Sequence, residues 1–103
     1  MAVDDAVLDD VFAALSDATR REVVERLLHG PATVTELAQP HGMSLPGFLK
    51  HLRVLEAAGL VTRSKEGRVV SCELAGEPMR EAAQWLARSR PKRSGGPGPT
   101  RKR

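Results

Sequence analysis

Apolar residues recur at helical spacing through the first third of the chain. The pattern predicts one helix over residues 4–16 and a second over residues 17–29, with Asp17 as the N-cap of the second helix. Gly30 and Pro31 follow at once and are expected to end that helix. The apolar faces consist of Val7, Leu8, Val11, Phe12 and Leu15 in the first helix and Val23, Val24, Leu27 and Leu28 in the second.

The next predicted helix is short and carries its own start signal. Thr33 or Thr35 begins it, and Thr33 with Glu36 has the spacing of a capping box, in which each residue's side chain accepts a hydrogen bond from the other's backbone N–H. Pro40 and Gly42 are expected to end this helix after about two turns. Its buried pair is Leu37 and Ala38.

A longer helix follows, which Ser44 is expected to cap and Gly59 to end. Pro46 stands in its first turn, where a missing N–H removes no helical hydrogen bond. The helical period predicts that one side packs inward while the opposite side remains in solvent. The residues predicted to face inward are Leu45, Phe48, Leu49, Leu52, Leu55 and Ala58.

After Gly59 the period changes from helical to alternating. Residues 60–65 and 69–74 predict two short strands. Between them, Glu66 and Gly67 predict a tight hairpin turn in which Gly67 takes a positive φ. The alternation places one face of the second strand toward the core, and its residues are Val70, Cys72 and Leu74.

The C-terminal part divides into a helix and a tail. A last helix is predicted over residues 77–88, with Met79, Ala82, Ala83 and Leu86 on one face. Residues 89–103 contain no apolar side chain and are expected to form a disordered basic tail, which leaves residues 1–88 as a single domain. The predicted fold is mainly α with a two-stranded β-wing, in the order α-α-α-α-β-β-α. A short helix, a turn and a longer capped helix, followed by a hairpin, are typical of a winged helix-turn-helix.

The charged residues are distributed unevenly along this fold. Residues 88–103 hold seven basic residues and no acidic one, whereas residues 1–87 hold nine basic and thirteen acidic residues, a net charge of −4. Within that acidic body, residues 50–68 hold five basic and two acidic residues, a net charge of +3. A basic patch on an acidic body favours a polyanionic partner such as nucleic acid, although an ordinary solvated face fits the charges equally well.

The longer helix and the hairpin supply the side chains expected to bind DNA. Such a helix fits the major groove with its N-terminal half at the base edges, while a wing lies along the minor groove or the phosphates. Lys50 is the leading candidate for a phosphate or guanine contact, and His51 either donates to a phosphate or packs within the protein. The predicted contacts are Ser44, Pro46, Gly47, Lys50, His51 and Arg53 in the helix and Arg63, Lys65 and Arg68 near the tip of the wing.

Apolar side chains on the first and last helices exceed what one small core can bury. They therefore predict a homodimer interface, although completing the core of a single chain is the alternative. The residues predicted for the interface are Val7, Leu8, Val11, Phe12, Met79, Ala82, Trp85 and Leu86. Two-fold symmetry would place two recognition helices roughly 34 Å apart, about one turn of DNA.

Three stretches resemble one known family: LSDATRREVVERL (15–27), TVTELA (33–38) and MSLPGFLKHLRVLEAAGLV (43–61). Over about residues 5–88 the chain is similar to the ArsR/SmtB-type bacterial winged-helix repressors. The resemblance implies a homodimer that is paired through the first and last helices and bound to a partly palindromic operator, with Ser44, Lys50 and His51 at or near the DNA. The Cys-x-Cys motif and last-helix ligands of metal-sensing members are missing, and Leu49 stands where a serine is common.

The sequence does not indicate metal binding, catalysis or insertion into a membrane. The histidines and the single cysteine, Cys72, fall on separate elements, so no metal or cofactor is expected, and neither a phosphate-binding glycine loop nor a paired nucleophile indicates an enzyme. No apolar run reaches the ~20 residues that span a bilayer, and the lone cysteine fits the cytoplasm. The leading hypothesis is a sequence-specific DNA-binding repressor. A winged-helix protein-interaction module, a ligand- or metal-gated sensor and a weak hypothesis of a Cys72 redox switch remain as alternatives.

Overall fold

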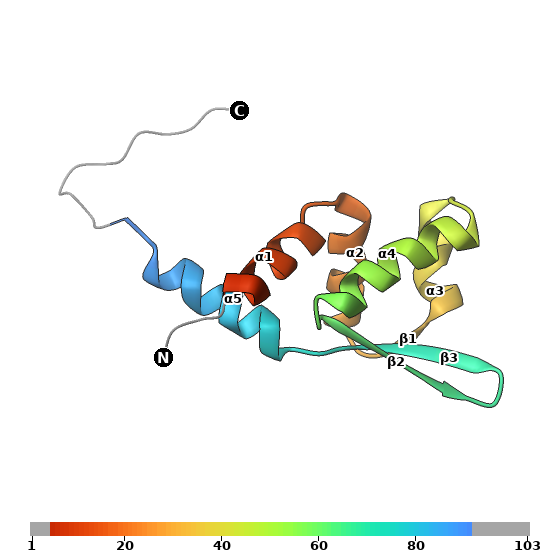
Figure 1. Cartoon of the computed structure of the whole chain (residues 1–103). Helices are drawn as coiled ribbons and strands as arrows, with labels where there is room; N and C mark the ends of the chain where they lie inside the picture. The colour runs from red at the N-terminus through yellow and green to blue at the C-terminus, as the bar shows by residue number, and fades with distance from the viewer. Residues whose placement is uncertain (1–4, 92–103) are drawn as a thin grey trace.

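The computed structural model describes residues 5–91 and has the predicted order of helices and hairpin (Figure 1). The helices are α1 (Asp5–Ala14), α2 (Ala18–Leu27), α3 (Val34–Ala38), the 3-10 helix η1 (Gln39–His41), α4 (Leu45–Ala57) and α5 (Glu77–Arg88). The strands are β1 (Ala32–Thr33), β2 (Val61–Glu66) and β3 (Val69–Leu74). The winged helix-turn-helix fold is thus confirmed. Most of the predicted basic tail, from residue 92 onward, lies outside the described residues.

Side-chain caps begin three of the helices where the sequence predicts them. Asp17 accepts a backbone N–H of the first turn of α2 at 3.1 Å. Thr33 and Glu36 form the reciprocal capping box of α3. Ser44 accepts a backbone N–H at the start of α4. Each cap satisfies a donor that the first helical turn leaves without a partner, so these helix starts are fixed by local chemistry.

The sheet has three strands rather than the predicted two. β1 pairs antiparallel with β3, with Ala32 opposite Cys72, so that β3 lies between β1 and β2. A strand of two residues is too short to show an alternating pattern, and the sequence therefore does not predict it. Its pairing ties the segment between α2 and α3 to the hairpin that forms the wing.

The hairpin turn lies one residue further along the chain than predicted. β2 continues through Glu66, which pairs with Val69, and the two loop residues are Gly67 and Arg68. The positive φ predicted for Gly67 is confirmed at 61°, and no residue other than glycine has a positive φ in the described chain. A two-residue loop whose first residue is a glycine of positive φ is typical of a type II′ turn. Arg68 therefore stands at the tip of the wing.

The recognition helix α4 also forms the centre of the core. Phe48, Leu52 and Leu55 are fully buried, and α4 packs against α1, α2 and β2. The inward face predicted for the hairpin is confirmed most clearly by Cys72, which is fully buried as well. Because α4 is held from several sides, the direction of its outer face is set by the core rather than by a flexible linker.

Two leucines predicted to face inward are exposed instead. Leu28, at the C-cap of α2, is 66% exposed, and Leu45, the first residue of α4, is 53% exposed. Both stand at helix ends, where the apolar period continues beyond the point at which neighbouring elements cover the helix. Leu49 is only partly buried. The periodic pattern therefore locates the core side of each helix but not how far along the helix the core extends.

α1 and α5 pack against each other at the end of the molecule away from the wing (Figure 1). This packing corrects part of the predicted dimer interface, because three of its residues are buried within the single chain: Leu8, Val11 and Ala82. Val7 and Met79 are partly buried against the same core. The residues left exposed are Phe12, Trp85 and Leu86, which we call the α1–α5 apolar face. The rings of Phe12 and Trp85 meet edge to face, with centroids 6.0 Å apart.

Candidate nucleic-acid interface

α3, the turn that contains η1, and α4 form the helix-turn-helix. Gly42, with a φ of 63°, redirects the chain between η1 and α4, because glycine adopts positive φ without steric cost. Ser44 then caps α4, and Pro46 is exposed in its first turn. Gly47 lies so close to the cap that an added Cβ would stand 3.1 Å from the Ser44 hydroxyl oxygen. Gly47 therefore packs closely on the cap at the start of α4.

Lys50 and Arg53 are exposed on the recognition helix, one turn apart. No hydrogen bond or ion pair within residues 5–91 engages the side chain of either residue. Their helix is fixed on its opposite side by Phe48, Leu52 and Leu55. The arrangement presents two exposed cations without an ion pair on a rigid support, and Arg53 also acts electrostatically on Glu56 one turn further along α4.

His51 contacts α2. Its Nδ1 accepts a hydrogen bond of 3.0 Å from the Arg20 Nη1, because a guanidinium has donors only. Nε of Arg20 donates at 2.7 Å to the carbonyl of Ala14, and the Asp17 Oδ2 lies 3.7 Å from the same histidine nitrogen. These contacts tie α4 to the corner between α1 and α2. With Nδ1 accepting from Arg20, the hydrogen of the ring is on Nε2, which remains available as a donor. The contact of this N–H with a phosphate remains a prediction.

Arg63 is bound to α4 and does not lie near the tip of the wing. Its Nε and Nη2 donate to the two carboxylate oxygens of Glu56 at 2.8 and 2.6 Å, and both side chains are about a quarter exposed. In the hairpin it pairs with Cys72, well before the turn. The predicted location is wrong because β2 leaves α4 directly and passes beside Glu56. Arg63 therefore braces the wing, and any contact it makes with DNA would compete with this pair.

Lys65 and Arg68 are the exposed cations of the outer wing. Lys65 lies opposite Val70 near the end of the ladder, and Arg68 stands in the turn itself. Neither takes part in an ion pair within the described chain. Glu66 is exposed beside them and offsets one of the two positive charges. The outer wing thus offers a weaker positive field than the sequence count of three cations implies.

The Glu56–Arg63 pair gives the wing a pH-dependent brace. The hydrogen bonds from Arg63 lower the pKa of the Glu56 carboxyl and outweigh burial, which acts in the opposite direction. A carboxyl whose pKa is lower in the folded state stabilises the fold above the ordinary pKa of a glutamate. That contribution is lost as the pH falls through the lower, folded-state value.

Replacing Glu56 by glutamine should lower the free energy of unfolding by about 1 kcal/mol at neutral pH, because a bidentate pair of this burial exceeds an exposed one. The difference from wild type should shrink as the medium is acidified through the folded-state pKa of Glu56. Urea unfolding over a pH series measures it. Glu77→Gln, which breaks the exposed Arg80–Glu77 pair on α5, is the control and should change little. An equal effect of both variants at every pH would contradict the brace.

The thiol of Cys72 is expected to be inert in the folded protein. The side chain is fully buried, and this burial raises the pKa of the thiol, so little reactive thiolate forms at neutral pH. A thiol reagent should label the chain stoichiometrically in denaturant and scarcely at all without it. Rapid labelling of the native chain would contradict the burial and would revive the redox hypothesis.

The described residues do not offer the elements of a metal site or a membrane span. Between residues 5 and 91, no three His, Cys, Asp or Glu side chains converge closely enough to hold a metal ion. His41, for example, stacks on Phe48 with ring centroids 5.7 Å apart and lies 3.5 Å from a Glu22 oxygen. In the same range, no helix has the length and apolar character needed to cross a membrane.

Comparison with known proteins supports this interpretation of the fold. A helix-turn-helix domain family matches residues 15–64, from the end of α1 to the middle of β2. A crystal structure of an ArsR family transcriptional regulator is 46% identical to this chain and superposes with a TM-score of 0.80, covering 85% of this chain and 91% of that one. The chain belongs to the ArsR family.

Two curated relatives of this ArsR-family chain are themselves regulators. The HTH-type transcriptional regulator Rv2034 of Mycobacterium tuberculosis is 51% identical over 53 residues, which are 52% of this chain and 50% of that protein. The transcriptional repressor SdpR of Bacillus subtilis is 27% identical over 79 residues, which are 77% of this chain and 88% of the repressor. The match thus spans about half the length of Rv2034 and most of SdpR. The resemblance drawn from the three sequence stretches is confirmed.

Proposed function

We propose that this chain is a homodimeric repressor that acts in the cytoplasm by binding a partly palindromic DNA operator, without catalysing a reaction. The observation that carries the proposal is the exposed pair of cations, Lys50 and Arg53, on a recognition helix fixed by the core. Membership of the ArsR family supports a regulatory role. Similarity to the repressor SdpR supports repression, rather than activation, of transcription.

Electrostatics and shape both favour a duplex as the partner. An α-helix fits the major groove, and its N-terminal half contacts base edges. Ser44, Pro46 and Gly47 form that end of α4, while Lys50 follows about one turn later. Lys65 and Arg68 are exposed on the wing, and we propose that they contact phosphates, which strengthen binding without specifying sequence. Each neutralised phosphate releases counterions, so binding should weaken steeply with salt.

The test of this function is selection of bound sequences from a pool of random duplexes by the full chain. We predict enrichment of a duplex with two related half-sites about one helical turn apart. Binding of that duplex should exceed binding of a scrambled one of equal length, and both affinities should fall with salt. Failure to enrich any sequence, together with equal weak binding of all duplexes, would refute the proposed function.

The α1–α5 apolar face, composed of Phe12, Trp85 and Leu86, is the surface we propose for the homodimer. Its three side chains are between 37% and 54% exposed in the single chain. Burying large apolar side chains against a second copy contributes roughly 1.5–3 kcal/mol for each one fully covered. The face lies at the end of the molecule away from the wing, so pairing there leaves both recognition helices free (Figure 1).

Leu86→Lys should convert the dimer to a monomer, because it places a charge from each copy within the apolar contact. Light scattering coupled to gel filtration measures the mass. Val69→Lys makes a similar change at a 52% exposed apolar residue beside the turn of the wing, away from α1 and α5, and it should leave the mass of the dimer unchanged. A wild-type chain that is monomeric at all concentrations, or an unaltered dimer in Leu86→Lys, would contradict the assignment.

A further inference from the structure

Leu45 is an exposed leucine at the base-facing end of the recognition helix. It is the first residue of α4, directly after the cap at Ser44, and 53% of it remains in solvent. Single exposed apolar side chains are common on protein surfaces and need no explanation by themselves. Leu45 differs because of its position in the motif and because of the surface beside it.

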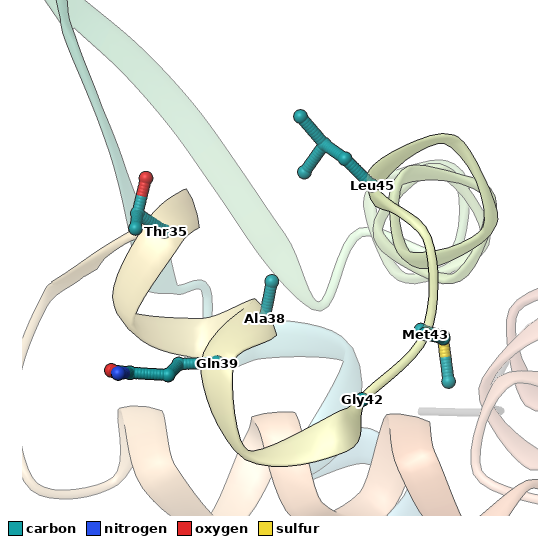
Figure 2. A pocket seen from close by; sticks show the side chains of 6 residues that line it. All are labelled: Thr35, Ala38, Gln39, Gly42, Met43 and Leu45. Carbon is teal, nitrogen blue, oxygen red and sulfur yellow. The ribbon is translucent and has the colours of Figure 1, made fainter.

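That surface is an uncharged hollow between α3 and the start of α4. It has a volume of about 410 Å³ and is lined by Thr35, Ala38, Gln39, Gly42, Met43 and Leu45. Figure 2 shows the side chains of Thr35, Ala38 and Leu45 on the same side of the motif, while those of Gln39 and Met43 point elsewhere. The hollow therefore presents the methyl groups of Ala38 and Leu45 beside the hydroxyl of Thr35 and no charge, which suits a mostly apolar group better than a phosphate.

Lys50 relates this hollow to the proposed DNA contact. It lies five residues after Leu45, which corresponds to about 7.5 Å along the helix axis. Five residues also turn the helix by about 140°, so Leu45 and Lys50 would face different walls of a groove that holds this end of α4, about two base steps of 3.4 Å apart along the helix axis. The only methyl group on a base edge in the major groove is the 5-methyl group of thymine.

We infer that Leu45, with Ala38 and Thr35, contacts the 5-methyl group of a thymine in each half-site and so contributes to the choice of sequence. The inference rests on the proposed function and deepens it, because it adds an apolar base contact to the cationic ones. Lys50 supplies affinity that depends on salt, whereas the Leu45 contact distinguishes one base from another. Removing the contacted methyl group should weaken binding by about fourfold, the value expected for one buried methylene-sized group.

The experiment replaces each thymine of the selected duplex, one position at a time, by deoxyuridine, which lacks the 5-methyl group. Affinity is measured for the wild type, for Leu45→Ala and for Leu28→Ala, which truncates an exposed leucine at the C-cap of α2. The wild type and Leu28→Ala should lose about fourfold at one thymine of the half-site. Leu45→Ala should bind the unmodified duplex more weakly and show a clearly smaller loss at that thymine. Circular dichroism and thermal melting verify that both variants fold.

The possible results distinguish the proposed DNA-binding function from the thymine contact of Leu45. A wild type that enriches no duplex refutes the proposed function itself. A wild type that binds a selected duplex but tolerates deoxyuridine at every position, or whose selected half-site contains no thymine, overturns only the Leu45 inference. The inference is overturned as well if Leu45→Ala keeps the wild-type sensitivity at the same thymine.

Discussion

Replacing Lys50 by alanine is expected to weaken binding to the selected duplex by roughly tenfold to a hundredfold, the effect of losing a hydrogen bond from a charged group. The side chain is exposed and is engaged by no ion pair within residues 5–91, so its removal should leave the fold intact. The dependence of affinity on salt should also become shallower, because each phosphate contact contributes to that slope. Fluorescence anisotropy over a salt series measures both quantities.

The matched control for Lys50 is Arg80→Ala. It removes one positive charge from α5, where Arg80 pairs with Glu77 in an exposed bridge. A general loss of positive charge would affect the two variants alike, whereas a contact at the groove affects only Lys50→Ala. Equal affinities of wild type and Lys50→Ala at both low and high salt would remove Lys50 from the interface.

Leu52→Ala is expected to lower the free energy of unfolding by about 2–5 kcal/mol, a large part of the stability of a small domain. Leu52 is fully buried in the middle of α4, and the core around it, including Phe48 and Leu55, can close only partly over the missing atoms. Urea unfolding at one fixed protein concentration measures the loss, since the stability of a dimer depends on concentration.

The same truncation at exposed Leu28 is the control for Leu52, and it should change stability by less than about 0.5 kcal/mol. A loss below about 1 kcal/mol for Leu52→Ala would mean that α4 is not anchored as described. The core would then not be what holds Lys50 and Arg53 on the outer side of α4. The two truncations therefore separate the core role of α4 from the role of its surface.

The sequence predicts well those features that depend only on neighbouring residues, namely helix caps and glycine turns. The caps at Asp17, Thr33 and Ser44 need only neighbours within three residues, and all three lie where they were predicted. Glycine at a tight turn is likewise a local requirement, which is why the positive φ of Gly67 could be anticipated although the turn itself is shifted by one residue. The confirmed fold follows from these signals together with the change of period after Gly59.

Features that depend on distant residues could not be predicted from the pattern. The Glu56–Arg63 pair forms only because β2 leaves α4 at a particular angle. Arg20 reaches His51 across 31 positions of sequence, and nothing in either segment indicates it. The exposure of Leu45 depends on where the elements packed against α4 end, which the helical period does not encode. The exposure of Lys50 and Arg53 was therefore predicted, whereas the contacts made by the residues around them were not.

The most direct test of the account is site-resolved acylation of lysines with and without the selected duplex. The chain has four lysines, and only Lys50 lies on the recognition helix, so mass spectrometry of the labelled chain follows that contact separately. We predict that the selected duplex slows acylation of Lys50 more than a scrambled duplex does at the same salt concentration. Equal acylation of Lys50 in the free protein and in a complex verified by mobility shift would contradict the claim that this face of α4 enters the groove.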